Sequence, residues 1–101
     1  MVSTAVKTLQ AMLEKWSAIP FPAEVDKAAD WPGPDSVAVD SELAGQLSLV
    51  AGGCVLRSEE RQELVDSLRA LDQVIASVPH AARRYFEHLK EIAVFALSVR
   101  P

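Results

Sequence analysis

Apolar residues recur every three or four positions along most of this chain, which is the spacing of a helix with one buried side. The first such stripe ends at Ile19, before Pro20, which cannot continue a helix. Two further stripes lie later in the chain, and each spans about twenty residues. The pattern therefore predicts three amphipathic helices, over about residues 3–19, 58–78 and 80–98.

A fourth segment has a weaker helical pattern and two possible starts, at Asp35 or at Asp40. We expect a helix over about residues 40–51, ended by the two glycines that follow it. An alternative interpretation takes residues 47–57 as a short hairpin around those glycines. A lone hairpin is marginally stable in water, so the helix is favoured.

Prolines determine how these helices connect. Four of them fall within residues 20–35, which predicts an irregular crossing that Phe21 and Trp31 anchor as large apolar side chains. Pro79 separates the last two helices and permits either a sharp corner or a kinked rod. The whole pattern predicts an all-α fold, a small four-helix bundle-like domain that spans residues 1–101.

The chain has more apolar residues than a small domain needs for its core. Half of its 101 residues are apolar and the mean hydropathy is +0.12. A domain of this size buries only about 60–65% of the surface that its unfolded chain exposes. The surplus is densest from Ile92 to Val99, which is apolar on every side of the predicted helix, so we expect a second chain to cover it. The interface candidates are Phe21, Trp31, Arg83, Arg84, Ile92, Phe95 and Val99.

Charge argues against a nucleic-acid partner. The net charge is −4 and no long basic tract is present, whereas phosphates require a cationic surface. A weaker alternative remains, a nucleic-acid-associated regulator that binds through four basic residues of the last segment, Arg83, Arg84, Lys90 and Arg100.

The sequence predicts a soluble protein of the cytoplasm. Cys54 is the single cysteine, which excludes an internal disulfide and favours a reducing compartment. The start of the chain has no secretory pattern. The longest uncharged run, residues 43–56, falls short of the ~20 apolar residues that span a bilayer.

No pattern in the sequence indicates catalysis, a metal or a cofactor. His80, Arg84 and His88 share one helix face, but the two histidines are ~12 Å apart along a helix, too far to bind one metal ion together. Cys54 has no base close to it in the sequence, and its glycines lack the rest of a phosphate-binding loop. We therefore expect no enzymatic activity.

The expected function is that of a protein–protein interaction module, a homodimer that acts as a small accessory, inhibitor or immunity-type, or adaptor protein. The alternative is a module that binds a small apolar ligand between its helices. Four aromatic residues would line that pocket: Trp16, Trp31, Tyr85 and Phe86.

Overall fold

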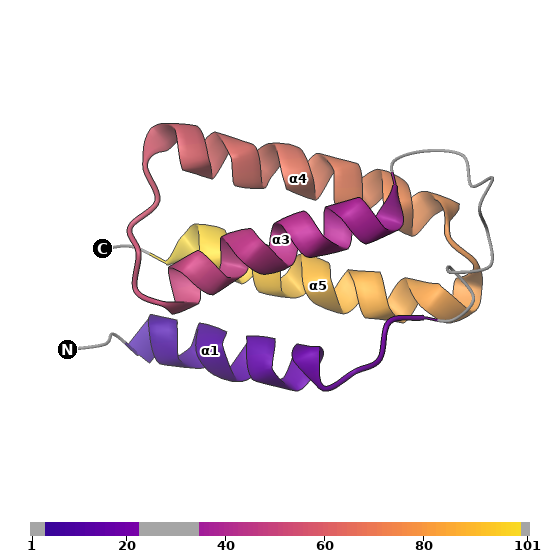
Figure 1. Cartoon of the computed structure of the whole chain (residues 1–101), viewed down its shortest axis with the longest axis horizontal. Helices are drawn as coiled ribbons and strands as arrows, with labels where there is room; N and C mark the ends of the chain where they lie inside the picture. The colour runs from indigo at the N-terminus through magenta and orange to yellow at the C-terminus, as the bar shows by residue number, and fades with distance from the viewer. Residues whose placement is uncertain (1–3, 23–34, 100–101) are drawn as a thin grey trace.

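A computed structural model describes residues 4–22 and 35–99 of the chain, and these residues form a bundle of four α-helices (Figure 1). The helices are α1 (Thr4–Ser17), α3 (Ser36–Ala51), α4 (Ser58–Ser77) and α5 (His80–Ser98). Successive helices run in opposite directions along the long axis of the molecule. The all-α, four-helix prediction is confirmed.

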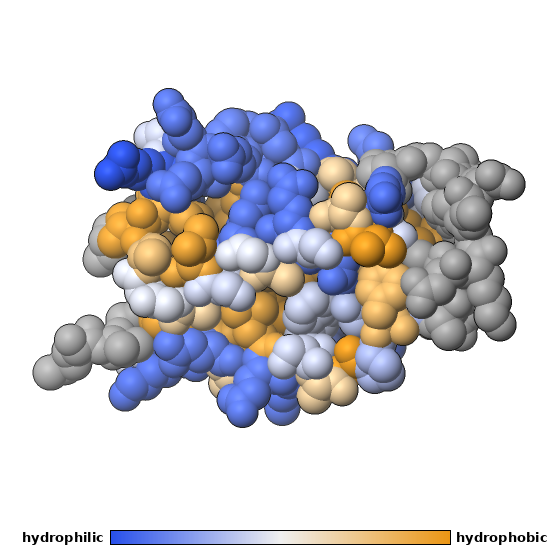
Figure 2. Space-filling view, in the orientation of Figure 1, coloured by the Kyte–Doolittle hydropathy of each residue, from blue (hydrophilic) through white to orange (hydrophobic). Residues whose placement is uncertain are grey.

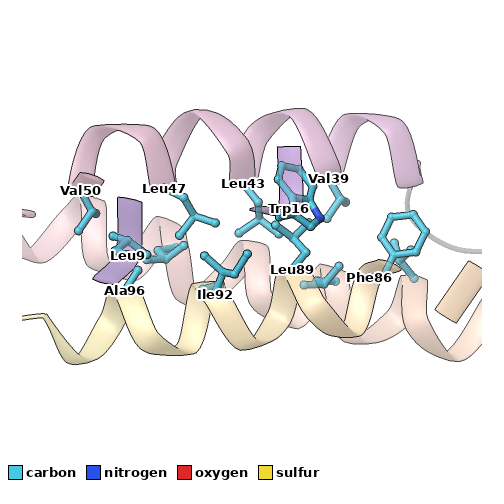
Figure 3. Close-up of a cluster of buried hydrophobic side chains, with 14 of the residues drawn as sticks. Leu9, Trp16, Val39, Leu43, Leu47, Val50, Phe86, Leu89, Ile92 and Ala96 are labelled. Carbon is cyan, nitrogen blue, oxygen red and sulfur yellow. The ribbon is translucent and has the colours of Figure 1, made fainter. Parts of the chain in front are cut away.

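Each helix packs against the next one along the chain, and α5 closes the ring by packing against α1. Helices α3 and α5 also contact each other across the middle, whereas α1 and α4 lie on opposite sides of that pair. The core is therefore built around the contact between α3 and α5. Figure 3 shows Leu43 and Leu47 of α3 pointing toward Leu89 and Ile92 of α5.

The start of α3 differs from the prediction. The helix begins at Ser36, four residues before the predicted start, because Asp35 caps it. The Asp35 carboxylate accepts hydrogen bonds from the backbone N–H groups of Val37, at 3.0 Å, and Ala38, at 3.3 Å. Two of the N–H groups that have no partner within a helix are thereby satisfied. Of the two aspartates that the sequence offered, Asp35 is the cap.

Residues 47–57, for which the sequence allowed either a helix or a hairpin, are helical as far as Ala51 and then form a turn. Gly53 has φ +90°, the left-handed conformation that favours glycine. The N–H of Cys54 donates to the Leu49 carbonyl and that of Gly53 to the Val50 carbonyl, which together form a Schellman motif. Residues 47–57 are thus the end of a helix and a connection.

Pro79 forms a sharp corner, which was one of the two predicted possibilities. Only Val78 and Pro79 separate α4 from α5, and the two helices lie antiparallel along their length (Figure 1). Farther along, Lys90 Nζ lies 2.7 Å from Asp72 Oδ1, and Arg61 donates to the Leu97 carbonyl at 2.8 Å. The corner therefore folds the apolar sides of both helices into one core.

Candidate functional site

The outer face of α3 is the least charged exposed helix surface of the described residues. We define this α3 outer face by its exposed residues, which lie within about 60° of Gly45 around the helix axis. Of the charged residues on α3, only Glu42 is exposed. The face consists of Ala38, Ser41, Glu42, Gly45, Ser48, Leu49 and Gly52.

The neighbouring helices carry charges where α3 does not. Figure 2 shows hydrophilic surfaces over α4 at the top and along α1 at the bottom, with a paler band between them where α3 lies. α4 alone exposes six charged side chains: Glu59, Arg61, Glu63, Asp66, Arg69 and Asp72. An uncharged strip between charged borders is the composition of a protein interface, whose centre is depleted of charge.

Two large apolar side chains lie exposed where α3 ends. Leu49 is 50% exposed and Val55, in the connection to α4, is 61% exposed. They belong to the uncharged run of residues 43–56. The Gln10 side chain of α1 donates to the Ala51 carbonyl at 2.6 Å, which ties this end of α3 to the bundle. The exposed apolar residues are therefore presented on an anchored part of the fold.

Gly45 has no role in the fold that requires a glycine. A Cβ atom built at this position has no atom within 4 Å, and the backbone is an ordinary helix. A glycine inside a helix costs ~1 kcal/mol relative to alanine. Gly45 nevertheless lies at the centre of the α3 outer face, where the missing side chain leaves room for another backbone to approach.

A hydrogen-bonded pair of polar residues lies where α3 and α5 begin. The Tyr85 hydroxyl donates to Asp40 Oδ2 at 2.7 Å, and both residues are half-buried. Burial raises the pKa of the Asp40 carboxyl, and the hydrogen bond from Tyr85 lowers it by a smaller amount. Burial, together with the hydrogen bond to Asp40 and its charge, raises the pKa of the Tyr85 hydroxyl. This pair links the two central helices.

Aromatic rings surround this pair. Phe21 meets Tyr85 edge to face with 5.6 Å between ring centroids, and Tyr85 meets Phe86 in the same way at 5.0 Å. The Trp16 ring lies 5.4 Å from Tyr85, and its buried Nε1 has no hydrogen-bond partner among the described residues. The structure thus brings together three of the aromatic residues predicted to line a ligand pocket. They pack on one another, which is the geometry of a filled core.

The predicted interface residues of α5 lie in different surroundings from those expected. Ile92 is fully buried, and Figure 3 shows it between α5 and α3. Phe95 and Val99 are partly buried and pack against the core. Val94, at 52%, is the only large apolar residue of α5 that is highly exposed. Ile92 therefore has no surface for a partner, whereas Val94, Phe95 and Val99 keep exposed surface, and the prediction that a second chain covers this end of α5 stays a prediction.

Of the other predicted site residues, those that the structure describes lie on α5 and in the aromatic cluster. Arg83 and Arg84 are exposed on the first half of α5, where Arg84 lines a shallow hollow with Glu87, His88 and Glu91. Phe21 lies in the aromatic cluster, and Trp31 and Arg100 lie outside the described residues. Lys90 is paired with Asp72. The α3 outer face was not predicted from the sequence, although the uncharged run of residues 43–56 indicates a surface with few charges.

Three further features were searched for in the described part of the chain: a metal site, a cysteine and a membrane-spanning helix. Within residues 4–22 and 35–99, no three histidine, cysteine or acidic side chains gather closely enough to hold a metal ion. Cys54 is exposed in the turn after α3. None of the helices in these ranges combines the length and the apolar character that crossing a membrane requires.

Comparison with known proteins found no match: no family model, curated protein or solved structure is significantly similar to this chain.

Proposed function

We propose that this protein is a non-enzymatic protein–protein interaction module and that the α3 outer face is its contact surface. The observation that carries the proposal is the group of exposed, uncharged residues at the end of α3 and after it, Ser48, Leu49 and 52–55, in which Leu49 and Val55 are at least half exposed. In α3, the rest of the bundle covers only the side that carries Leu43 and Leu47.

The biological role fits a small accessory, inhibitor-type or adaptor protein. Such a protein acts by occupying a surface of its partner and needs no catalytic group of its own. A single exposed thiol is compatible with a reducing compartment, which supports the proposal of a cytoplasmic location. Partners of this kind recognise an apolar centre with a polar rim, which the charged sides of α1 and α4 provide here.

Site-specific photo-crosslinking in the native cell tests the proposal. A photoreactive phenylalanine analogue replaces Leu49 in one variant and Val94 in the control, because the two side chains are almost equally exposed, at 50% and 52%. We expect protein adducts from position 49 in at least fivefold excess over position 94. Equal or absent adducts from the two positions would overturn the proposal.

A further inference from the structure

The border between α3 and α4 exposes both apolar and acidic side chains, and we propose that it binds a cationic amphipathic helix of the partner. This inference rests on the proposed function, since it gives the chemistry of the partner that the end of α3 contacts. We define the α3–α4 border by six exposed residues of the two helices and their connection: Glu42, Leu49, Val55, Glu59, Glu63 and Asp66.

The α4 side of this border carries three carboxylates. Arg61 and Asp72 mark the side of α4 that faces α5, through a hydrogen bond and an ion pair to that helix. α4 also packs against α3, which therefore lies along the opposite side of α4. At about 100° per residue, Glu59, Glu63 and Asp66 lie on that opposite side, about 120–180° around the helix from the two residues that face α5.

Leu49 and Glu42 lie on the side of α3 that borders α4. Asp40 marks the other side of α3, because it accepts a hydrogen bond from Tyr85, whose ring lies 5.4 Å from that of Trp16 in α1. Leu49 and Glu42 lie about 160–180° around α3 from Asp40. Since α3 packs against α1, α4 and α5, its side away from α1 borders α4.

Exposed apolar side chains lie next to these carboxylates at one end of the border. α3 ends and α4 begins at this end of the bundle, and Figure 2 shows apolar surface there, beneath the hydrophilic surface of α4. Leu49 in the last turn of α3 and Val55 in the connection are at least half exposed. A surface with apolar and charged groups side by side suits a partner that is itself amphipathic.

The carboxylates of the border are not neutralised by the chain itself. Within residues 4–22 and 35–99, none of the four forms an ion pair, and Asp66 accepts a hydrogen bond from the uncharged Gln62 at 3.0 Å. Two exposed cations are close in sequence, Arg57 before α4 and Arg69 one turn after Asp66. Two cations against four carboxylates leave a net charge of −2. Opposite charge on a partner steers the encounter and selects that partner over others.

Gln46 adds an unpaired acceptor at the edge of the border. It lies between Glu42 and Leu49 in the sequence and on the same side of α3. Its buried Oε1 atom has no hydrogen-bond partner among the described residues. The residue as a whole is only partly buried, so a rotation of its side chain would present this oxygen to an N–H group of the partner. Lysine and arginine side chains supply such groups.

The length of the border fits a helix. Glu42 and Leu49 are seven residues apart, as are Glu59 and Asp66, and each pair spans ~10 Å, about two helical turns. Over that length an amphipathic helix presents apolar residues in a stripe and can flank them with cations. A second copy of this chain is a poorer fit, because two chains of net charge −4 repel each other.

Binding of two synthetic peptides to the full chain tests the proposal. Both peptides have ~14 residues with leucines at helical spacing, and the other positions are lysine in one and glutamate in the other. Fluorescence anisotropy of the labelled peptides measures the dissociation constants at ~0.15 M salt, where long-range attraction is screened. We expect the lysine peptide to bind at least tenfold more tightly than the glutamate peptide. Failure of the lysine peptide to bind, or equal binding of both, overturns the proposal.

Matched variants locate the binding site on the chain. Glu59→Gln with Glu63→Gln should weaken binding of the lysine peptide at least fivefold. The control pair, Glu87→Gln with Glu91→Gln on α5, removes the same charge from exposed positions at the same spacing and should bind like the wild type. Equal weakening by the two pairs would mean that overall charge attracts the peptide, and the proposed site would be wrong.

The apolar contact has its own pair of variants. Leu49→Ser should weaken binding at least fivefold, whereas Val94→Ser on α5 should leave it unchanged, since the two side chains are 50% and 52% exposed. Circular dichroism verifies that each variant is helical. Unchanged binding by a helical Leu49→Ser variant would contradict a partner whose apolar side rests on this residue.

The photo-crosslinking experiment separates this inference from the proposed function. Adducts in excess at position 49, together with failure of the peptide experiment, overturn the cationic helix and leave the proposed function standing. The absence of adducts overturns the proposed function, whatever the peptides do.

Discussion

Helices α3 and α5 contact each other at the centre of the bundle, yet they meet the solvent in opposite ways. The last turns of α5 have the more continuous apolar run, from Ile92 to Val99, and of its large apolar residues only Val94 is highly exposed. α3 leaves an outer side to solvent as well, and on it Leu49 is 50% exposed. Each of the two helices contacts the other three, so the residues on its outer side, and not its number of neighbours, decide what kind of surface it exposes.

The two helices also differ in the polar residues that they expose. α5 exposes charged residues along its outer side, Arg83, Arg84, Glu87, Lys90 and Glu91. The α3 outer face instead carries a single charged residue, Glu42, among alanine, serine, glycine and leucine residues. A surface that a partner covers has to give up its hydration, and uncharged groups lose less when they do so.

The largest expected effect is on stability, and it tests which residues of α5 and α3 are buried. Ile92→Ala should lower the free energy of unfolding by ~2–5 kcal/mol, because it leaves a cavity in the core. Leu49→Ala should lower it by less than ~1 kcal/mol, because that side chain is half exposed. Urea unfolding measures both, at a chain concentration at which the protein sediments as a monomer. A larger loss for Leu49→Ala would show that the assignment of inner and outer sides is wrong.

The next effect concerns the beginning of α3. Asp35→Ala should destabilise the protein by ~1 kcal/mol, because two backbone N–H groups lose the carboxylate that caps them. Asp35→Asn is the control, since asparagine caps a helix almost as well. Urea unfolding of the two variants provides the comparison. Equal losses in both would mean that the side-chain cap contributes nothing.

A gain in stability is expected at the centre of the α3 outer face. Gly45→Ala should raise the free energy of unfolding of the monomer by up to ~1 kcal/mol, because alanine favours the helix and meets no atom within 4 Å. Thermal unfolding at low chain concentration measures the gain. A loss of stability would reveal a contact at Gly45 within the chain itself, and the case for an approaching partner would fall.

The smallest effect concerns the pair that joins the two helices. Burial raises the pKa of the Asp40 carboxyl in the folded state, so between its ordinary value of 3.8 and the raised value the folded state binds more protons than the unfolded state. Stability should therefore fall as pH increases through this window.

Asp40→Asn should remove that pH dependence while its amide oxygen still accepts from Tyr85. The difference between variant and wild type should stay below ~1 kcal/mol, because the carboxyl is only half-buried and water screens it. Denaturation curves from pH 3 to pH 8 measure it. Parallel curves for the two proteins would contradict the assigned role of Asp40.

Much of the fold could be predicted from the sequence because the signals are local. The apolar spacing located the helices, Pro20 ended the first and Pro79 separated the last two. The glycine pair ended α3, although only the structure assigns the left-handed conformation to Gly53. The start of α3 was predicted too late because Asp35 and Asp40 are equally good caps in sequence. Their roles separate only when Asp40 reaches Tyr85, which is 45 residues away.

The candidate site could not be predicted from the sequence. A periodic pattern indicates which side of a helix is apolar, but it does not indicate which apolar residues the other helices leave exposed. Two features of the sequence by itself were sufficient to determine four helices: a 3.6-residue period and the backbone limits of proline and glycine. Only the tertiary structure decided that the apolar end of α5 buries Ile92, Ala93 and Ala96 and leaves Val94 exposed, and that α3 leaves Leu49 exposed. The physical reason is that burial depends on neighbours brought together from distant parts of the chain.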